Sequence, residues 1–248
     1  MGELGLGAAN VGNLYRAISD EDARAVLEAA WESGIRDYDT APHYGLGLSE
    51  RRLGAFLATK PRSEYVVSTQ VGRLLRPSPE TADRLDDENQ FAVPAATRRV
   101  WDFSADGIRT SLEESLDRLG LERVDVVYLH DPDEHDLEAD LATGIPAVAA
   151  LRDAGLVKAV GIGSKSTEAL TAAARTGKLD LAMVAGRYTL LEQADELVAA
   201  CREAGVGIVA AAVFNSGLLA KPRPGGRYEY GAVPAELLAR AERIAQVC

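Results

Sequence analysis

Short apolar runs alternate with amphipathic stretches along the chain. The predicted strands lie at 4–7, 35–40, 65–71, 124–130, 157–163, 181–187 and 206–212, and taken together they are mainly apolar. After each run, apolar residues recur every three or four positions, at 19–33, 49–59, 104–119, 145–154, 166–176, 191–204 and 234–247. A continuous apolar run is typical of a buried parallel strand, and the longer spacing is typical of a helix. The pattern therefore predicts an α/β fold in which helices cover a parallel sheet.

The number of strands decides whether such a sheet can close. A TIM (β/α)8 barrel needs eight parallel strands, and a length of 248 residues suits one such barrel. The pattern supplies seven strands, so we expect a single domain over 1–248 of the TIM-barrel type that lacks the eighth strand and helix. An open edge between the first and seventh strands would carry unpaired backbone groups, which is a route to self-association.

Residues 73–103 interrupt the alternation. The segment is rich in Pro, Asp, Arg and Thr and shows little periodicity. Long loops inside a compact domain usually serve a function, so we interpret this one as a lid that follows the third strand. A disordered surface insertion is the alternative. Trp101 and Phe103, at the end of the segment, favour packing over disorder.

Composition narrows the class of partner. The chain carries 38 acidic and 27 basic residues, for a formal net charge of −11. Nucleic acids and anionic membranes bind clustered Lys and Arg, so we expect neither as a partner. The longest apolar run, 206–214, is too short to span a bilayer. Cys201 and Cys248 offer no disulfide framework, and the start of the chain has no basic leader, so we expect a cytoplasmic protein.

Proton-handling side chains gather where the second predicted strand ends. Asp39, His43 and Tyr44 lie close together in sequence beside a turn, and His130 ends the fourth predicted strand. Acids, phenols and imidazoles are the usual general acid–base groups, and α/β barrels place their chemistry at strand ends. We therefore expect these four side chains to meet in one site. A purely structural role for Tyr44 or His130 is the alternative.

Several motifs resemble those of the aldo-keto reductases, in the same order along the whole chain. The matching stretches are GIRDYDTAPHYG at 34–45, VVSTQVG at 66–72, DVVYLH at 125–130 and NSGLL at 215–219. Within that family the chain is most similar to the group of sugar 1-dehydrogenases and pyridoxal 4-dehydrogenases. The resemblance implies an oxidoreductase that uses NADP or NAD and acts on a small carbonyl compound, sugar or hemiacetal.

That family uses a tetrad of Asp, Tyr, Lys and His at the strand ends of its barrel. By position, the resemblance implies that Asp39 is the acid, Tyr44 the proton donor and acceptor, and His130 the residue that orients the substrate oxygen. Gln70 stands where the family has its lysine. We also expect His43 and Trp101 to contact the small-molecule substrate.

The resemblance further implies a cofactor-binding set after the fifth, sixth and seventh strands. Its members are Ser164, Lys165, Tyr188, Phe214, Asn215, Ser216, Gly217 and Leu218. The family's amide contact and stacking tyrosine fall on Ala185 and Ala211. Lys165 could equally be a loop lysine that faces solvent. The chain stops before the family's loop for the adenosine side of the cofactor, so we expect weakened cofactor binding.

Glutamine at position 70 changes the acid–base chemistry that the tetrad implies. A free phenol titrates at about pH 10, and an adjacent ammonium lowers that pKa by roughly 1 to 3. Glutamine is neutral and cannot lower it. We expect much of the typical general acid–base contribution, about 10²- to 10⁴-fold, to be lost. Asp39 would also lose its counter-charge, which should raise its pKa or draw in another cation, and Arg73 is the candidate by proximity in sequence.

Other classes of function stay open. Both departures, Gln70 and the early end, affect cofactor chemistry while the proton-handling groups remain. A cofactor-independent proton transfer such as elimination, isomerisation or cyclisation is therefore one alternative, and a barrel that only binds a ligand is another. The run from His130 to Asp136 could suggest a metal-dependent hydrolase, but its spacing matches no zinc signature, and acidic loop residues are usually solvated.

Overall fold

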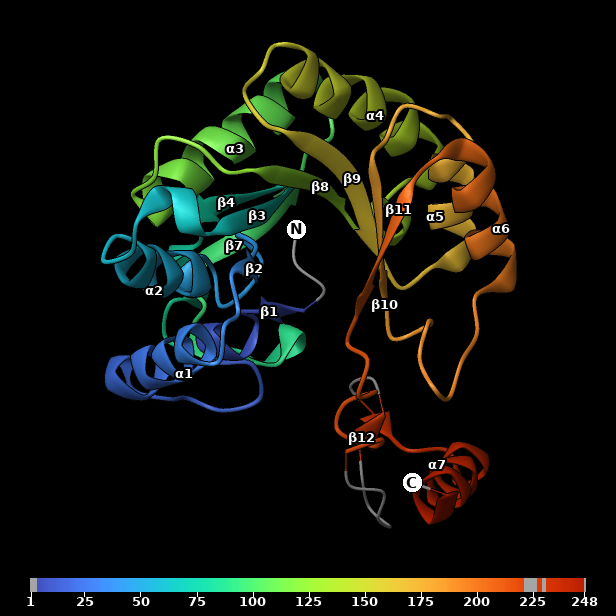
Figure 1. Ribbon diagram of the computed structural model, residues 1–248. Coiled ribbons are helices and arrows are strands. Elements are labelled where there is room, and N and C mark those ends of the chain that lie inside the picture. The colour runs from blue at the N-terminus through green and yellow to red at the C-terminus, as the bar shows by residue number, and fades with distance from the viewer. Residues whose placement is uncertain (1–3, 221–226, 229–230, 248) are drawn as a thin grey trace. The chain divides into compact units, whose positions relative to one another are not determined.

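The computed structural model describes residues 4–220, 227–228 and 231–247. The chain forms two compact units, Met1–Gly161 (unit 1) and Ile162–Cys248 (unit 2). Each unit combines parallel strands with helices, and Figure 1 follows them along the chain from blue to red. Cys248 lies outside the described residues.

Unit 1 contains a parallel sheet in the order β1-β2-β3-β8. Its strands are β1 (Gly5–Gly7), β2 (Asp37–Asp39), β3 (Val66–Val71) and β8 (Val126–His130). The register pairs Asp39 with Ser68 and Gln70 with Tyr128. Because successive residues of a strand point to opposite faces, the polar residues that share one face include Asp39, Ser68, Gln70, Tyr128 and His130.

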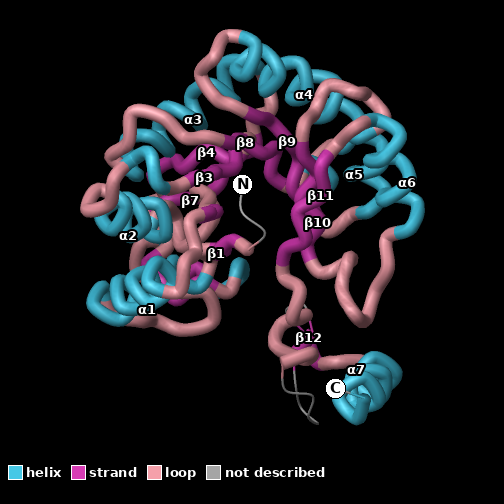
Figure 2. The backbone as a smooth tube through the Cα atoms, viewed as in Figure 1, coloured by secondary structure: helices cyan, strands magenta, loops and turns pink. Residues whose placement is uncertain are grey.

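Helices surround this sheet, as the cyan segments of Figure 2 show. They are α1 (Asp20–Glu32), α2 (Leu48–Leu57), α3 (Ala105–Leu119), α4 (Leu137–Asp153) and the short 3₁₀ turns η1 (Asn10–Gly12), η2 (Arg62–Glu64), η3 (Pro79–Thr81), η4 (Asp87–Asn89) and η5 (Pro132–Glu134). The hydroxyls of Ser19 and Ser104 accept hydrogen bonds from the backbone N–H three residues on, which satisfies donors that the first turns of α1 and α3 leave unpaired. The sequence thus fixes where these two helices begin.

α4 is longer than its sequence pattern indicated. It begins at Leu137 rather than at 145 and continues through Pro146. The side chain of Asp136 accepts a hydrogen bond from the N–H of Ala139 and so starts the helix earlier. Gly144 and Pro146 disfavour a helix interior, which is why the first half of α4 was not predicted.

The segment 73–103 forms short antiparallel strands instead of the irregular loop that its lack of periodicity indicated. β4 (Arg73–Pro77) pairs with β7 (Thr97–Trp101), and β5 (Leu85–Asp86) pairs with β6 (Phe91–Pro94). Phe91 and Val93 are buried against Leu46, next to Tyr44. Strands of two to five residues are stabilised by cross-strand pairs, so they leave little periodic signal along the sequence.

Unit 2 carries a second parallel pair. β9 (Ala159–Ser164) begins in unit 1 and ends in unit 2, where β10 (Leu181–Ala185) pairs with β11 (Gly207–Ala211). The other elements are α5 (Thr167–Ala174), α6 (Asp195–Ala204), β12 (Arg227–Tyr228), β13 (Gly231–Ala232) and α7 (Ala235–Val247). α7 packs on a small core that includes Leu191, Leu218 and Ala241. Cys201 of α6 is a buried thiol.

Each apolar run of the sequence coincides with a strand, and the strands described here pair in parallel within each unit. The predicted α/β class is therefore confirmed. Within the residues that the structure describes, no helix has the length and apolar character that crossing a membrane requires.

Candidate active site

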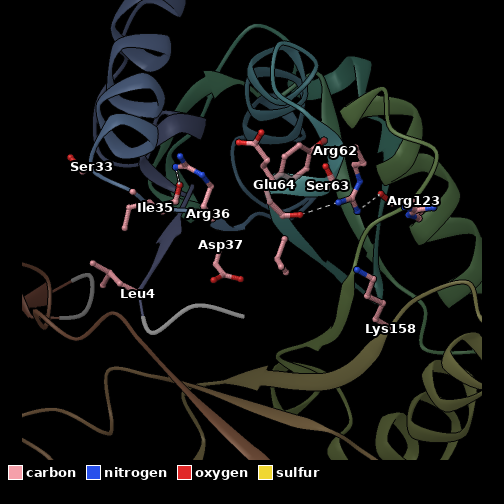
Figure 3. A pocket seen from close by; sticks show the side chains of 13 residues that line it. Leu4, Ser33, Ile35, Arg36, Asp37, Arg62, Ser63, Glu64, Arg123 and Lys158 are labelled. Carbon is pink, nitrogen blue, oxygen red and sulfur yellow. Dashed lines mark hydrogen bonds between the residues drawn. The ribbon is translucent and has the colours of Figure 1, made fainter.

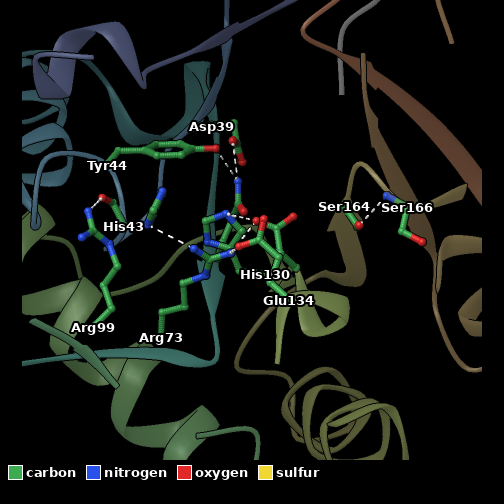
Figure 4. Close-up of polar contacts among 11 residues, drawn as sticks. Asp39, His43, Tyr44, Arg73, Arg99, His130, Glu134, Ser164 and Ser166 are labelled. Atoms are coloured by element: carbon green, nitrogen blue, oxygen red, sulfur yellow. Dashed lines mark hydrogen bonds and ion pairs between the residues drawn. The ribbon is translucent and has the colours of Figure 1, made fainter. Parts of the chain in front are cut away.

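Asp39, Gln70 and Tyr44 meet at the C-terminal ends of β2 and β3. The side-chain nitrogen Nε2 of Gln70 donates hydrogen bonds to Asp39 Oδ2 (3.1 Å) and to the hydroxyl oxygen of Tyr44 (3.0 Å). Ser68 Oγ donates to the other carboxylate oxygen of Asp39 at 2.6 Å. A single amide thus connects the acid to the phenol, and Figure 4 shows the hydroxyl of Tyr44 directed toward Asp39.

The ionisation of Asp39 is strongly shifted from that of an ordinary aspartate. Burial raises the pKa of its carboxyl to about 7, although the hydrogen bonds from Ser68 and Gln70 favour the ionised form. The sequence predicted that Asp39 would either have a raised pKa or be paired with another cation, for which Arg73 was the candidate. The first prediction is confirmed. The second outcome is wrong, because Arg73 pairs with Asp131 and Glu134.

Tyr44 is held in place by the loop after β2 and by segment 73–103. Its ring lies 6.3 Å from that of Phe91, centroid to centroid, within an apolar cluster. The loop closes tightly on Gly12, since a Cβ on Gly45 would stand 2.1 Å from the Gly12 carbonyl oxygen, and Gly45 has a positive φ of 62°. Only glycine suits position 45, so the backbone next to Tyr44 is fixed by packing.

His130 ends β8 and is buried, with 5 % exposure. Its ring centroid lies 5.9 Å from that of Tyr44 and 5.4 Å from that of His43, and both ring pairs meet edge to face. Its Nε2 lies 3.3 Å from Asp131 Oδ2. The structure therefore brings together all four side chains that the sequence placed at the strand ends, in the cluster that Figure 4 draws.

A buried arginine completes this cluster. Arg73, 4 % exposed, directs its guanidinium to His43 Nδ1 (3.2 Å), Asp131 Oδ2 (2.5 Å) and Glu134 Oε2 (3.1 Å). Trp101 covers the guanidinium carbon at 4.2 Å from its ring centroid. Trp101 also stacks on His135, with centroids 5.7 Å apart. The sequence predicted Trp101 as a substrate contact. In the structure its ring packs on Arg73 and His135.

The residues expected to hold a cofactor lie in unit 2 and differ in exposure. Asn215 is 4 % exposed; its Nδ2 donates to the Gly186 carbonyl (3.0 Å), and its Oδ1 has no hydrogen-bond partner among the described residues. Tyr188 and Phe214 expose 42 % and 63 % of their surface. A buried amide oxygen in need of a donor, next to the exposed ring of Phe214 in sequence, fits a ring-and-amide ligand such as nicotinamide.

The other residues expected to bind the cofactor differ in burial and backbone conformation. Ser164 Oγ is buried and accepts a hydrogen bond from the Ser166 N–H at 2.8 Å. Lys165 is half-buried. Ser216 and Gly217 follow Asn215 with positive φ angles of 58° and 89°. Leu218, in contrast, belongs to the core beneath α7 and is 2 % exposed, so its side chain serves packing.

The opposite, N-terminal end of the same strands is also polar. A cavity of about 690 Å³ lies there, lined by cations and acids that include Arg36, Arg62, Lys158, Asp37 and Glu64 (Figure 3). Beside it, Asp125 is 1 % exposed. Its Oδ2 accepts hydrogen bonds from Arg62 (2.8 Å) and from the Val67 N–H (3.0 Å), and its Oδ1 forms an ion pair with Lys158 Nζ (2.9 Å). Although burial would raise the pKa of Asp125, these hydrogen bonds bring it below its usual range.

The acidic run after β8 serves local structure. Asp131 and Glu134 bind Arg73, and His135 Nδ1 lies 2.8 Å from Asp140 Oδ2. Over the ranges 4–220, 227–228 and 231–247 the structure shows no group of three or more His, Cys, Asp or Glu side chains arranged to hold a metal ion.

Sequence reasoning missed three of these residues. Ser68 binds Asp39, and Asp131 with Glu134 anchors Arg73. Ser68 had a usable signal, because it lies two residues before Gln70 on the same face of one strand. The partners of Arg73 had none, since 58 and 61 residues separate them from it.

The sequence matches the model of the aldo/keto reductase family over residues 3–239. It is 63 % identical to a D-threo-aldose 1-dehydrogenase of a Pseudomonas species, over 99 % of this chain and 76 % of that protein. It is 38 % identical to a pyridoxal 4-dehydrogenase of Microbacterium luteolum, over 99 % of this chain and 77 % of that protein.

Solved structures give the same picture. A structure titled as a putative aldo-keto reductase of Pseudomonas aeruginosa superposes with a TM-score of 0.62 at 32 % identity, covering 83 % of this chain and 70 % of that one. An aldo-keto reductase of Bacillus halodurans in its holo form reaches a TM-score of 0.69 at 24 % identity, over 93 % and 69 % of the two chains. The latter likeness concerns the fold.

Proposed function

The chain belongs to the aldo-keto reductase family, with the α/β TIM-barrel fold of that family, and on this premise we propose that it oxidises an aldose at C1 with NAD or NADP. Aldo-keto reductases are typically NAD(P)-dependent oxidoreductases with small-molecule substrates. We propose that the reaction in this chain is slow, because Gln70 takes the place of the lysine.

The observation that carries this proposal is the bridge from Asp39 through Gln70 to the hydroxyl of Tyr44, with the ring of His130 beside that phenol. In this proposal Tyr44 takes the proton of the C1 hydroxyl, and His130 orients the same oxygen. A nicotinamide held by the residues of unit 2 would supply the acceptor for the hydride of C1, and the hemiacetal would become a lactone. The proton and the hydride thus leave from one carbon–oxygen unit.

The hydrogen-bond donors that the structure gives Asp39 and the hydroxyl of Tyr44 are neutral. The described contacts of Asp39 are Ser68 and Gln70, both neutral. Lys at position 70 would lower the phenol's pKa by its positive charge, whereas the amide only donates a hydrogen bond. We therefore expect Tyr44 to act as an inefficient base near neutral pH, and we expect the rate to rise toward alkaline pH.

We propose that unit 2 supplies the cofactor contacts. Asn215 offers a buried amide oxygen, Tyr188 and Phe214 offer exposed rings, and Lys165 offers a positive charge for a phosphate. Support for a sugar substrate comes from the relatives named above, one of which is a D-threo-aldose 1-dehydrogenase and the other a pyridoxal 4-dehydrogenase.

The test measures the reduction of NAD and of NADP by their absorbance in the presence of each of a panel of aldoses. Tyr44→Phe removes the proposed base and should slow the reaction by about 10²- to 10⁴-fold. Tyr65→Phe is the matched control, because Tyr65 is buried just before the N-terminal end of β3 and should leave the rate unchanged. An unchanged rate in Tyr44→Phe, or no reduction with any aldose, would contradict the proposal.

One observation favours a second function, a proton transfer without cofactor. A carboxyl with a pKa of about 7 can both give and take a proton near neutrality, and Asp39 has this property. Deuterium uptake from heavy water at C2 of an aldose, measured by NMR without nicotinamide, would support this function. Uptake that is equal in wild type and in Asp39→Asn would rule it out.

A further inference from the structure

Arg73 occupies a fixed position within the candidate site. It begins β4, and its register partner across the hairpin is Trp101. The indole ring covers the guanidinium, and two carboxylates bind one of its terminal nitrogens. A planar cation that is stacked on one side and bonded at its edge has little freedom to turn. Its remaining terminal nitrogen, NH1, faces His43 at 3.2 Å.

The contact with NH1 determines where His43 carries its proton. A guanidinium in a protein stays protonated and has donors only, so it cannot accept a hydrogen bond. Nδ1 of His43 must therefore be the acceptor, and an imidazole whose Nδ1 accepts carries its hydrogen on Nε2. A hydrogen on Nδ1 would place two N–H groups against each other.

We propose that Arg73 is a positioning residue that holds His43 as a neutral imidazole with its hydrogen on Nε2, ready to donate to a substrate hydroxyl other than the reacting one. The part about the substrate rests on the proposed aldose oxidation. A donor of this kind recognises a polyhydroxy compound, because each ring hydroxyl of a sugar can accept a hydrogen bond. The part about the imidazole rests on Arg73 alone.

Asp131 lies between this arginine and the second histidine. Its Oδ2 lies 2.5 Å from Arg73 Nη2 and 3.3 Å from His130 Nε2. The carboxylate accepts from the guanidinium and places its negative charge beside the His130 ring. Asp131 adopts a positive φ of 44°, which is unusual for a residue other than glycine and indicates that the loop is shaped by these contacts.

The chain provides its own control for the experiment. It contains three histidines, which are His43, His130 and His135. His135 Nδ1 lies 2.8 Å from Asp140 Oδ2, so that nitrogen must donate, and His135 has the opposite tautomer from His43. A ¹⁵N–¹H correlation spectrum of the ring nitrogens distinguishes the two tautomers in the intact protein without substrate or cofactor. Assignment comes from His43→Gln and His135→Gln.

In wild type at pH 8, His43 should show a bare Nδ1 and a protonated Nε2, and His135 the reverse. A protonated Nδ1 on His43 at pH 8 would overturn the proposal, with no variant needed. Arg73→Lys keeps a donor and should keep the tautomer. Arg73→Met removes it, and the Nε2-protonated form should give way to a mixture, whereas Arg76→Met, on the same strand but bound to Glu114, should change nothing.

Kinetics then separate this proposal from the aldose reaction. His43→Phe keeps a ring but loses the donor, so KM for the aldose should rise by about 3- to 10-fold with kcat nearly unchanged. An unchanged KM would remove the role of His43 in substrate binding and leave the tautomer result intact. Absence of any aldose turnover in wild type would instead count against the proposed reaction, while the spectrum would still test Arg73.

Discussion

Two buried aspartates at opposite ends of one sheet have opposite ionisation. Asp125, just before β8, is held by Lys158, Arg62 and a backbone N–H, and its pKa lies below the usual range. Asp39, at the end of β2, accepts hydrogen bonds from a hydroxyl and an amide, and burial raises its pKa to about 7.

The difference shows that burial alone does not set the charge of a carboxyl. Both groups lose hydration, and what distinguishes them is whether cations stand within hydrogen-bond distance. One end of the sheet is therefore built for stability and the other for a group that changes protonation near neutral pH. Four changes test this contrast.

The largest effect should come from giving Asp39 the cation that Asp125 already has. Gln70→Lys should lower the pKa of Asp39 and favour the phenolate of Tyr44, raising aldose oxidation by about 10²- to 10⁴-fold. Initial rates of nicotinamide reduction measure it. Gln193→Lys, at an exposed glutamine, adds the same charge elsewhere and should leave the rate as it was. A rate that Gln70→Lys fails to raise would mean that the missing charge is not what limits turnover.

The next effect concerns folding. Asp39 ionises at about 3.8 in the unfolded chain but at about 7 in the folded protein, so ionisation weakens folding between these values. The stability that the protonated Asp39 carboxyl contributes to the folded protein is fully present below pH 3.8 and is lost as pH rises toward 7. The loss amounts to at most about 4 kcal/mol. Urea titrations at stepped pH should show that Asp39→Asn lacks this decline, and an identical decline in both proteins would contradict it.

Asp125 should behave with the opposite sign. Its lowered pKa means that its contribution is present above the unfolded pKa and is lost as pH falls through the folded one. Asp125→Asn removes the charge that pairs with Arg62 and should destabilise the protein by about 1 to 3 kcal/mol at pH 7. Lys158 is largely exposed and contributes little to this figure. Chemical denaturation at pH 7 measures the change, and a gain in stability would refute it.

The smallest effect should come from Tyr128, which lies between the two ends. Its hydroxyl is buried and has no hydrogen-bond partner among the described residues, and its pKa is raised by burial and by the charges of Asp39 and Asp37. Tyr128→Phe removes a buried hydroxyl whose loss of hydration no described hydrogen bond offsets. Thermal unfolding should therefore show a stabilisation of about 1 kcal/mol. A destabilised variant would reveal that this hydroxyl is satisfied after all.

Prediction from sequence worked where the signal was local. Apolar runs placed the strands, and Asp39, Tyr44, Gln70 and His130 were expected together because each stands at or just after a strand end. The raised pKa of Asp39 followed from the neutral side chain at position 70. These inferences needed only strand ends and the charge of one side chain.

Prediction failed where contacts join distant parts of the chain. Arg73 was expected near Asp39 because it is close to Gln70 in sequence, but Gly72, with a φ of 102°, lies between β3 and the start of β4. The change of direction takes Arg73 to Asp131 and Glu134 instead. Segment 73–103 was likewise expected as a loop, since pairing between short strands depends on partners that periodicity does not reveal.

The amide of Gln70 has one more effect. Its nitrogen donates to the Tyr44 hydroxyl, so the phenolic oxygen serves as acceptor on that side and its own hydrogen must point another way. A planar amide anchored on Asp39 by the same nitrogen holds this arrangement in place. The glutamine at position 70 thus acts on the phenol as a neutral donor and leaves it with its hydrogen directed away from the acid.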